Sequence, residues 1–119
     1  MRYMTRKDIM DRLRLSRSAT YRIVGTAGGK LVSARDVVAI LNQSRRGTQP
    51  LLMEVPADIV TGEELAKKIG SVNARQVHNW TRRTLNPPPH FLLNSHCRRF
   101  QLSAVAAWLD AHSKIVKRG

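Results

Sequence analysis

The sequence predicts a mainly α fold with a small β-hairpin wing, built from two tandem helix-turn-helix units of which the second is winged. Three observations support this fold class. The same apolar pattern occurs twice, each copy begins with two short amphipathic helices, and a proline-rich segment with strand-like stretches enlarges the second copy alone. A chain of 119 residues can hold one ordinary domain or two very small ones.

The first helix of each copy is predicted by an N-cap followed by a helical apolar pattern. A threonine is followed three residues later by an acid, as in a capping box. Apolar residues then occupy positions i, i+1 and i+4, one face of a helix. The residues are Thr5, Asp8, Ile9, Met10 and Leu13 in the first copy and Thr61, Glu64, Leu65, Ala66 and Ile69 in the second.

A second helix follows in each copy after a short turn. Ser16 and Asn73 are suitable N-caps. They lie 57 residues apart, against 56 for the first helices, so the second copy has one extra residue in its turn, near Gly70. Two short helices joined in this way form a helix-turn-helix. The helix from Asn73 is predicted to reach about Thr84, well beyond the length of its counterpart.

A closing helix ends each copy. The apolar segments 37–41 and 105–109 match at an offset of 68 residues, and each follows an extended piece that ends at Val32 or Phe100. The growth of the offset lies between the second helix and the closing helix. A winged fold places its hairpin there.

The inserted segment of the second copy predicts that hairpin. Prolines 87–89 end the preceding helix. Residues 90–93 and 98–102 are expected to be strands around an Asn-Ser-His-Cys turn. The first copy has only the turn 26–30 at this place, and therefore no wing.

These matches predict two domains and a linker. The N-terminal unit covers residues 1–46, the linker 47–57 and the winged unit 58–119. The apolar stretch 51–55 is expected to pack on one of the units.

The charge of the chain points to a polyanionic partner. Lys and Arg number 21 against 8 acids, a net charge of +13. No acid lies between Asp11 and Asp36, or between Glu64 and Asp110. Such separation produces a one-signed face, and double-stranded DNA is the partner that we expect. The plainer reading is a solvated basic face.

The second helices carry the side-chain types that read base edges. Arginine pairs with guanine, and asparagine or glutamine with adenine, in the major groove. Serine and tyrosine hydroxyls more often hold phosphates, so the first copy is expected to position more than it specifies. The wing arginines are expected on phosphates or in the minor groove, or one of them over Trp108. The predicted DNA-binding residues are Arg17, Ser18, Tyr21, Arg22, Asn73, Arg75, Gln76, Asn79, Arg82, Arg83, Arg98 and Arg99.

Two parts of the chain resemble known families. Residues 15–24 resemble the recognition helix of AlpA-type phage regulators and excisionases. Residues 61–66, 77–80, 96–100 and 105–109 are similar to the MerR-type winged helix-turn-helix, although the long dimerisation helix of that family is absent. The resemblance implies a small DNA-binding protein of a phage or mobile element, acting as a transcriptional regulator, a recombination directionality factor (excisionase), or both. It implies integrase or RNA polymerase as protein partners.

Other kinds of site find little support. His90, His96, Cys97 and His112 lack zinc-ligand spacing, and no cofactor or catalytic residue is predicted. We therefore expect no enzyme. The start of the chain has no signal-peptide pattern and no apolar run is long enough for a membrane helix, so a cytoplasmic, nucleoid-associated protein is expected, as a monomer or a weak oligomer on DNA.

Two other functions remain open at this point. One is a DNA-packaging recognition subunit, and the other is an interaction module or anti-activator whose basic face binds an acidic partner. Within the DNA-binding reading, both units are expected to touch the duplex, with the second supplying most of the base specificity.

Overall fold

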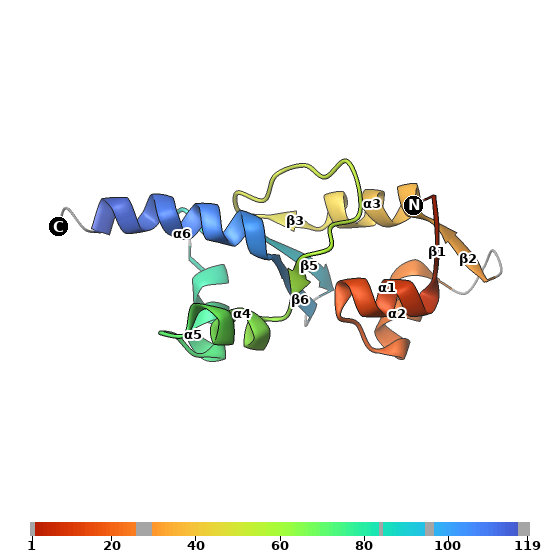
Figure 1. Cartoon of the computed structure of the whole chain (residues 1–119), viewed down its shortest axis with the longest axis horizontal. Coiled ribbons are helices and arrows are strands. Elements are labelled where there is room, and N and C mark those ends of the chain that lie inside the picture. Colours follow the sequence, from red (N-terminus) through yellow and green to blue (C-terminus); the bar gives the residue numbers. More distant parts are fainter. Residues whose placement is uncertain (1, 26–29, 84, 95–96, 117–119) are drawn as a thin grey trace.

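Two similar runs of secondary structure follow each other along the chain (Figure 1). The computed structural model describes residues 2–25, 30–83, 85–94 and 97–116, with side chains up to Ala111. The first run is β1 (Tyr3–Thr5), α1 (Arg6–Leu13), α2 (Arg17–Val24), β2 (Leu31–Ser33) and α3 (Ala34–Gln43). The second is β4 (Ile59–Val60), α4 (Gly62–Ile69), α5 (Ala74–Thr81), β5 (His90–Asn94), β6 (Cys97–Gln101) and α6 (Leu102–Val116), and β3 (Arg45–Arg46) lies between the runs.

Equivalent hydrogen bonds confirm the internal repeat. The amide of Ala34, the first residue of α3, donates to the carbonyl of Arg2 at 2.9 Å. The amide of Leu102, the first residue of α6, donates to the carbonyl of Asp58, also at 2.9 Å. These pairs are related by the offsets of 56 and 68 residues seen in the sequence. Each closing helix is thus tied to the residue that precedes the first strand of its own copy.

The predicted helix starts are confirmed in both copies. Thr5 and Thr61 each form a complete capping box with the acid three residues later. Ser16 and Asn73 accept hydrogen bonds from the amides of Ala19 and Gln76. These contacts satisfy amide groups that a helix leaves unpaired at its first turn.

The turn inside each helix pair has the same geometry despite its different length. Arg14 ends α1 at φ 56° and Gly70 ends α4 at φ 86°, both in the left-handed region. Glycine adopts this conformation without strain, whereas arginine does so at a cost. The second turn has the extra residue that the sequence predicts.

The strands form two small antiparallel sheets. In one, β1 pairs with β2. The other has the strand order β3-β5-β6-β4. Among the described residues, six helices accompany these sheets, so the fold combines α and β structure rather than being mainly α. The predicted hairpin is present as β5 and β6, while β1, β3 and β4 were not predicted.

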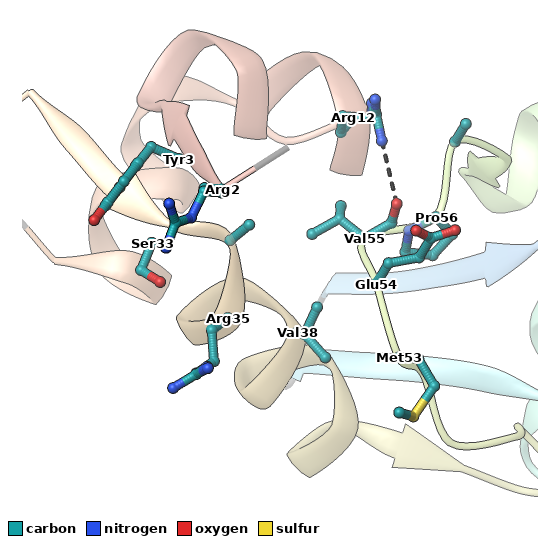
Figure 2. A pocket seen from close by; sticks show the side chains of 12 residues that line it. Arg2, Tyr3, Arg12, Ser33, Arg35, Val38, Met53, Glu54, Val55 and Pro56 are labelled. Atoms are coloured by element: carbon teal, nitrogen blue, oxygen red, sulfur yellow. Dashed lines mark hydrogen bonds between the residues drawn. The ribbon is translucent and has the colours of Figure 1, made fainter.

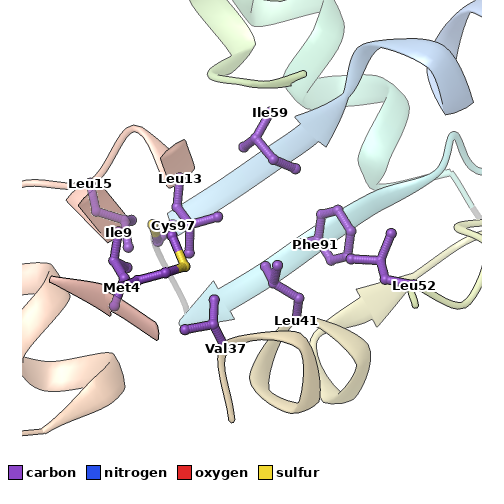
Figure 3. Close-up of a cluster of buried hydrophobic side chains, with 10 residues drawn as sticks. All are labelled: Met4, Ile9, Leu13, Leu15, Val37, Leu41, Leu52, Ile59, Phe91 and Cys97. Carbon is purple, nitrogen blue, oxygen red and sulfur yellow. The ribbon is translucent and has the colours of Figure 1, made fainter. Parts of the chain in front are cut away.

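The two copies share one hydrophobic core. Met4, Ile9 and Leu13 of the first copy pack in the same cluster as Phe91 and Cys97 of the second, as Figure 3 shows. Leu52 is buried in this cluster, so the apolar linker stretch packs as expected. A second cluster lies under α4, α5 and α6; its buried members are Val60, Leu65, Ala66, Val77, Phe100 and Val105.

Two predictions about boundaries need correction. The division at residue 46 passes through a common structure, because β3 pairs with β5 and the core spans both copies. The helix expected from Asn73 to Thr84 ends at Thr81, so α5 has 8 residues, the same length as α2. The amides of Arg82 and Arg83 bond to carbonyls three residues back, which tightens the last turn before the prolines. Thr84 itself lies outside the described residues, as do residues 26–29 and 95–96 of the predicted turns.

No helix in the described part of the chain is long and apolar enough to cross a membrane.

Candidate nucleic-acid interface

Both helix pairs lie along one long edge of the molecule. Figure 1 places α1 with α2 and α4 with α5 on this edge, and α3 and α6 on the opposite one. The sheet β3-β5-β6-β4 runs between the two edges. The molecule measures 54 × 25 × 23 Å, so the pairs are spread along its longest dimension. A single extended ligand can therefore contact both.

The second helix of each pair presents exposed polar residues and no acid. Neither α2 nor α5 contains Asp or Glu. Thr20 and Val77 occupy equivalent positions and are fully buried. The opposite faces are therefore free to meet a ligand. The exposed residues among those predicted are Arg17, Ser18 and Arg22 of the first copy and Asn73, Arg75, Gln76, Asn79, Arg82 and Arg83 of the second.

Equivalent positions on the two helices carry different chemistry. Counting from the N-caps, Ser18 of α2 matches Arg75 of α5, and Arg22 matches Asn79. On α5 this gives a guanidinium and an amide one turn apart. On α2 it gives a hydroxyl and a guanidinium. The α5 face thus has the greater capacity to distinguish base edges.

Two of the predicted α5 residues also hold the start of the helix. The side-chain oxygen of Asn73 accepts from the amide of Gln76 at 2.9 Å, and Gln76 Oε1 accepts from the amide of Asn73 at 2.8 Å. A bidentate pair between Gln76 and adenine would use the same Oε1. Arg75 and Asn79 are not occupied in this way. They are the stronger candidates for base contact.

Tyr21 on α2 is held between two arginines. The guanidinium carbons of Arg6 and Arg17 lie 5.3 and 5.7 Å from the centre of its ring. Arg6 Nε also donates to the carbonyl of Gly25 at 3.1 Å, which joins α1 to the end of α2. Arg6 was not among the predicted site residues. Its position could be found only once α1 was packed against α2.

The two wing arginines are both half-buried on β6 but have different surroundings. Arg99 Nε donates to the carbonyl of Leu13 at 3.0 Å, and its Nη2 donates to that of Arg14 at 2.6 Å. These are the last carbonyls of α1, where a cation is favourable. The sequence assigns Arg99 to phosphate, whereas its guanidinium is engaged in joining the two copies. Arg98 remains available for a ligand.

Arg99→Ala is expected to lower the free energy of unfolding by about 1–3 kcal/mol, because charge-assisted hydrogen bonds to the end of α1 are lost. Urea unfolding followed by circular dichroism measures the change. Arg98→Ala, which removes the same charge from the neighbouring position, should change stability by less than about 0.5 kcal/mol. Equal effects of the two substitutions would show that Arg99 does not brace the junction.

A second polar contact crosses the same junction. Arg14 Nε lies 3.4 Å from Glu64 Oε2. The hydrogen bond from the amide of Thr61 lowers the pKa of the Glu64 carboxyl, and the charge of Arg14 adds to this effect. The carboxylate thus stays ionised and paired. Its charge is partly neutralised near the proposed face.

The predicted packing of the tryptophans is confirmed. Trp80 and Trp108 are in contact, with ring centres 5.7 Å apart, and both lie on apolar faces. The arginine over Trp108 is Arg83, with its guanidinium carbon 5.9 Å from the ring centre, and not a wing arginine. Arg83 is therefore partly committed to packing.

His90 does not add charge to the surface. It is buried, and its Nδ1 lies 2.8 Å from the carbonyl of Pro88. Burial lowers the pKa of its imidazole below the usual value, so that the ring is neutral near pH 7. No cluster of three or more possible metal ligands occurs within the described residues, which leave out His96 and the side chain of His112.

Comparisons with protein-family models, curated proteins and solved structures give no match for this chain.

Proposed function

We propose that this chain is a sequence-specific double-stranded DNA-binding protein with two helix-turn-helix units, the second of them winged, in the manner of AlpA-type and MerR-type proteins. The observation that carries the proposal is the pair of equivalent, acid-free second helices on one edge of the molecule. A helix of this kind fits the major groove of DNA. The net charge of +13 supports a polyanionic ligand.

The two helices have different tasks in this mechanism. Arg17 and Arg22 on α2, with Arg82 at the end of α5, contact phosphates and set the position of the protein on the duplex. Arg75 and Asn79 on α5 read base edges. Arg98 on β6 reaches the backbone beside α5. Both copies contact the same duplex, because they belong to one structure with a common core.

In the cell, such a protein acts as a transcriptional regulator, an excisionase, or both, on the DNA of a phage or mobile element. Regulators and excisionases use the same contacts, the former to recruit or block polymerase and the latter to shape DNA beside an integrase. Footprinting on the DNA that flanks its own gene distinguishes a promoter site from a recombination site. The proposed place of action is the nucleoid.

Arg75→Ala is expected to relax sequence preference by about 1–3 kcal/mol at one base pair, because a bidentate contact to a base edge is lost. The preferred site is first selected from random duplexes with the full chain. Fluorescence anisotropy then compares that site with its single-base variants.

Arg82→Ala is the matched control for this measurement, since it removes the same charge from the same helix end. It should weaken all the duplexes alike. If Arg75→Ala also weakens them alike, α5 does not read bases through Arg75 and the recognition helix is misassigned.

A further inference from the structure

A groove lies outside the two second helices. It has a volume of about 740 Å³ and is lined by the start of α3, the segment 53–57, the N-terminal residues Arg2 and Tyr3, and Arg12 of α1 (Figure 2). None of its lining residues comes from α2 or α5. A ligand in this groove does not compete with a duplex bound along those helices.

The walls of the groove are held in place by the core and by hydrogen bonds. Asn42 donates to the carbonyl of Leu52 at 3.0 Å and accepts from its amide at 2.8 Å. Arg12 Nη1 donates to the carbonyl of Val55 at 3.2 Å, a contact drawn in Figure 2. The side chain of Val55 packs against the shared core. The segment that forms one wall is therefore fixed at both ends of the groove, and the groove exists before a ligand binds.

Part of the lining is apolar and open to solvent. Met53 is 89% exposed and Tyr3 is 59% exposed. Val38, on the first turns of α3, and Pro56 contribute further apolar surface. Large exposed apolar side chains gathered around a concave surface are typical of sites that bind other proteins. A methionine is suited to such a site because its side chain adapts to different partners.

The charged part of the lining is predominantly basic. Three arginines, Arg2, Arg12 and Arg35, face one acid, Glu54. Within the described residues, neither Arg2 nor Arg35 forms a hydrogen bond or ion pair through its side chain. Ser33 gives no side-chain cap to α3, so the first amides of this helix add positive potential at the same end of the groove. The lining therefore favours a ligand that carries negative charge.

We propose that this groove binds an acidic peptide segment of a partner protein, with a large apolar side chain of that segment against Met53 and Val38 and its carboxylates beside Arg2 and Arg35. The apolar wall favours a peptide over a phosphate backbone, because nucleic acid would leave Met53 and Val38 without contact. The arginines favour an acidic peptide over a neutral one. The basic edge would then bind DNA while the groove holds a protein.

A selection from random twelve-residue peptides displayed on phage tests this proposal with the full chain as target. The double variant Arg35→Glu, Met53→Asp serves for counter-selection, which removes peptides that bind elsewhere on the basic surface. Both side chains are exposed, so the variant should keep the fold. We expect the enriched peptides to combine acids with a leucine, methionine or aromatic residue.

A synthetic peptide with the enriched sequence is then titrated against single variants. Arg35→Ala and Met53→Asp should each weaken its binding at least tenfold, whereas Lys68→Ala, which removes an exposed charge from α4, should change it less than twofold. Failure to enrich any sequence, or enrichment of peptides without acids or without large apolar residues, overturns the proposal. So does a loss of duplex affinity in Arg2→Ala and Arg35→Ala equal to that in Arg82→Ala, because the groove would then face DNA.

Discussion

Phe91→Ala is expected to lower the free energy of unfolding by about 3–5 kcal/mol, the usual cost of removing a fully buried phenylalanine side chain. Phe91 is 0% exposed and belongs to the cluster that contains Met4 and Leu13 of the first copy and Ile59 of the second. The cavity would therefore lie between the copies. Such a loss is a large part of the stability of a small domain.

Chemical unfolding followed by both circular dichroism and tryptophan fluorescence measures this effect. Trp80 and Trp108 both lie in the second copy, whereas circular dichroism reports on helices of both. The two signals should change together, in the wild type and in the variant. Leu85→Ala is the control, because Leu85 is 79% exposed, and should change stability by less than about 0.5 kcal/mol. Separate transitions, with only one of them shifted by Phe91→Ala, would contradict a common core.

The shared core also determines how the two copies can be studied. A segment that begins at Asp58 would expose Ile59, Phe91 and Cys97, which are buried against the first copy. It would also lose β3, the strand that pairs with β5. Substitutions in the full chain are therefore the appropriate way to separate the contributions of the two copies.

The sequence predicts well those features that depend on neighbouring residues. The capping boxes at Thr5 and Thr61, the N-caps at Ser16 and Asn73 and the hairpin of β5 and β6 all follow from local signals. The repeat was visible because each copy uses the same caps. A cap is a strong signal since it needs a particular side chain at a particular place.

Features that depend on distant residues could not be read in this way. β4 has only two residues, and its pairing with β6 joins positions about 40 residues apart. Arg99 resembles any wing arginine in the sequence, and only the packing of the copies brings the end of α1 to its guanidinium. The same packing creates the groove at Met53.

The length of α5 illustrates a limit of periodicity. Residues beyond Thr81 continue a polar pattern that is compatible with a helix, and the prolines mark an end only at residue 87. The helix ends earlier because the amides of Arg82 and Arg83 turn to carbonyls three residues back. The reach of Arg82 and Arg83 into a groove is correspondingly shorter than a helix to Thr84 would allow.

The largest functional effect is expected from salt. If about six to eight phosphates are neutralised, the plot of log affinity against log salt concentration should have a slope of about −5 to −7. Affinity for a duplex should then fall by about 10³–10⁴-fold between 50 and 200 mM salt. Fluorescence anisotropy with a labelled duplex of about two turns measures it. An acidic polypeptide bound with equal affinity at every salt concentration would instead favour a general basic surface without preference for DNA.

The most direct test of the account is the salt slope of two double variants beside that of the unmodified chain. Arg17→Ala with Arg22→Ala removes two charges from the first helix pair, and Arg82→Ala with Arg98→Ala removes two from the second copy. Each double variant should make the slope shallower by about 2, because each lost phosphate contact reduces it by about 1. A slope for the unmodified chain shallower than about −2, or a slope left unchanged by the Arg17 and Arg22 substitutions, would contradict the binding of one duplex by both helix pairs.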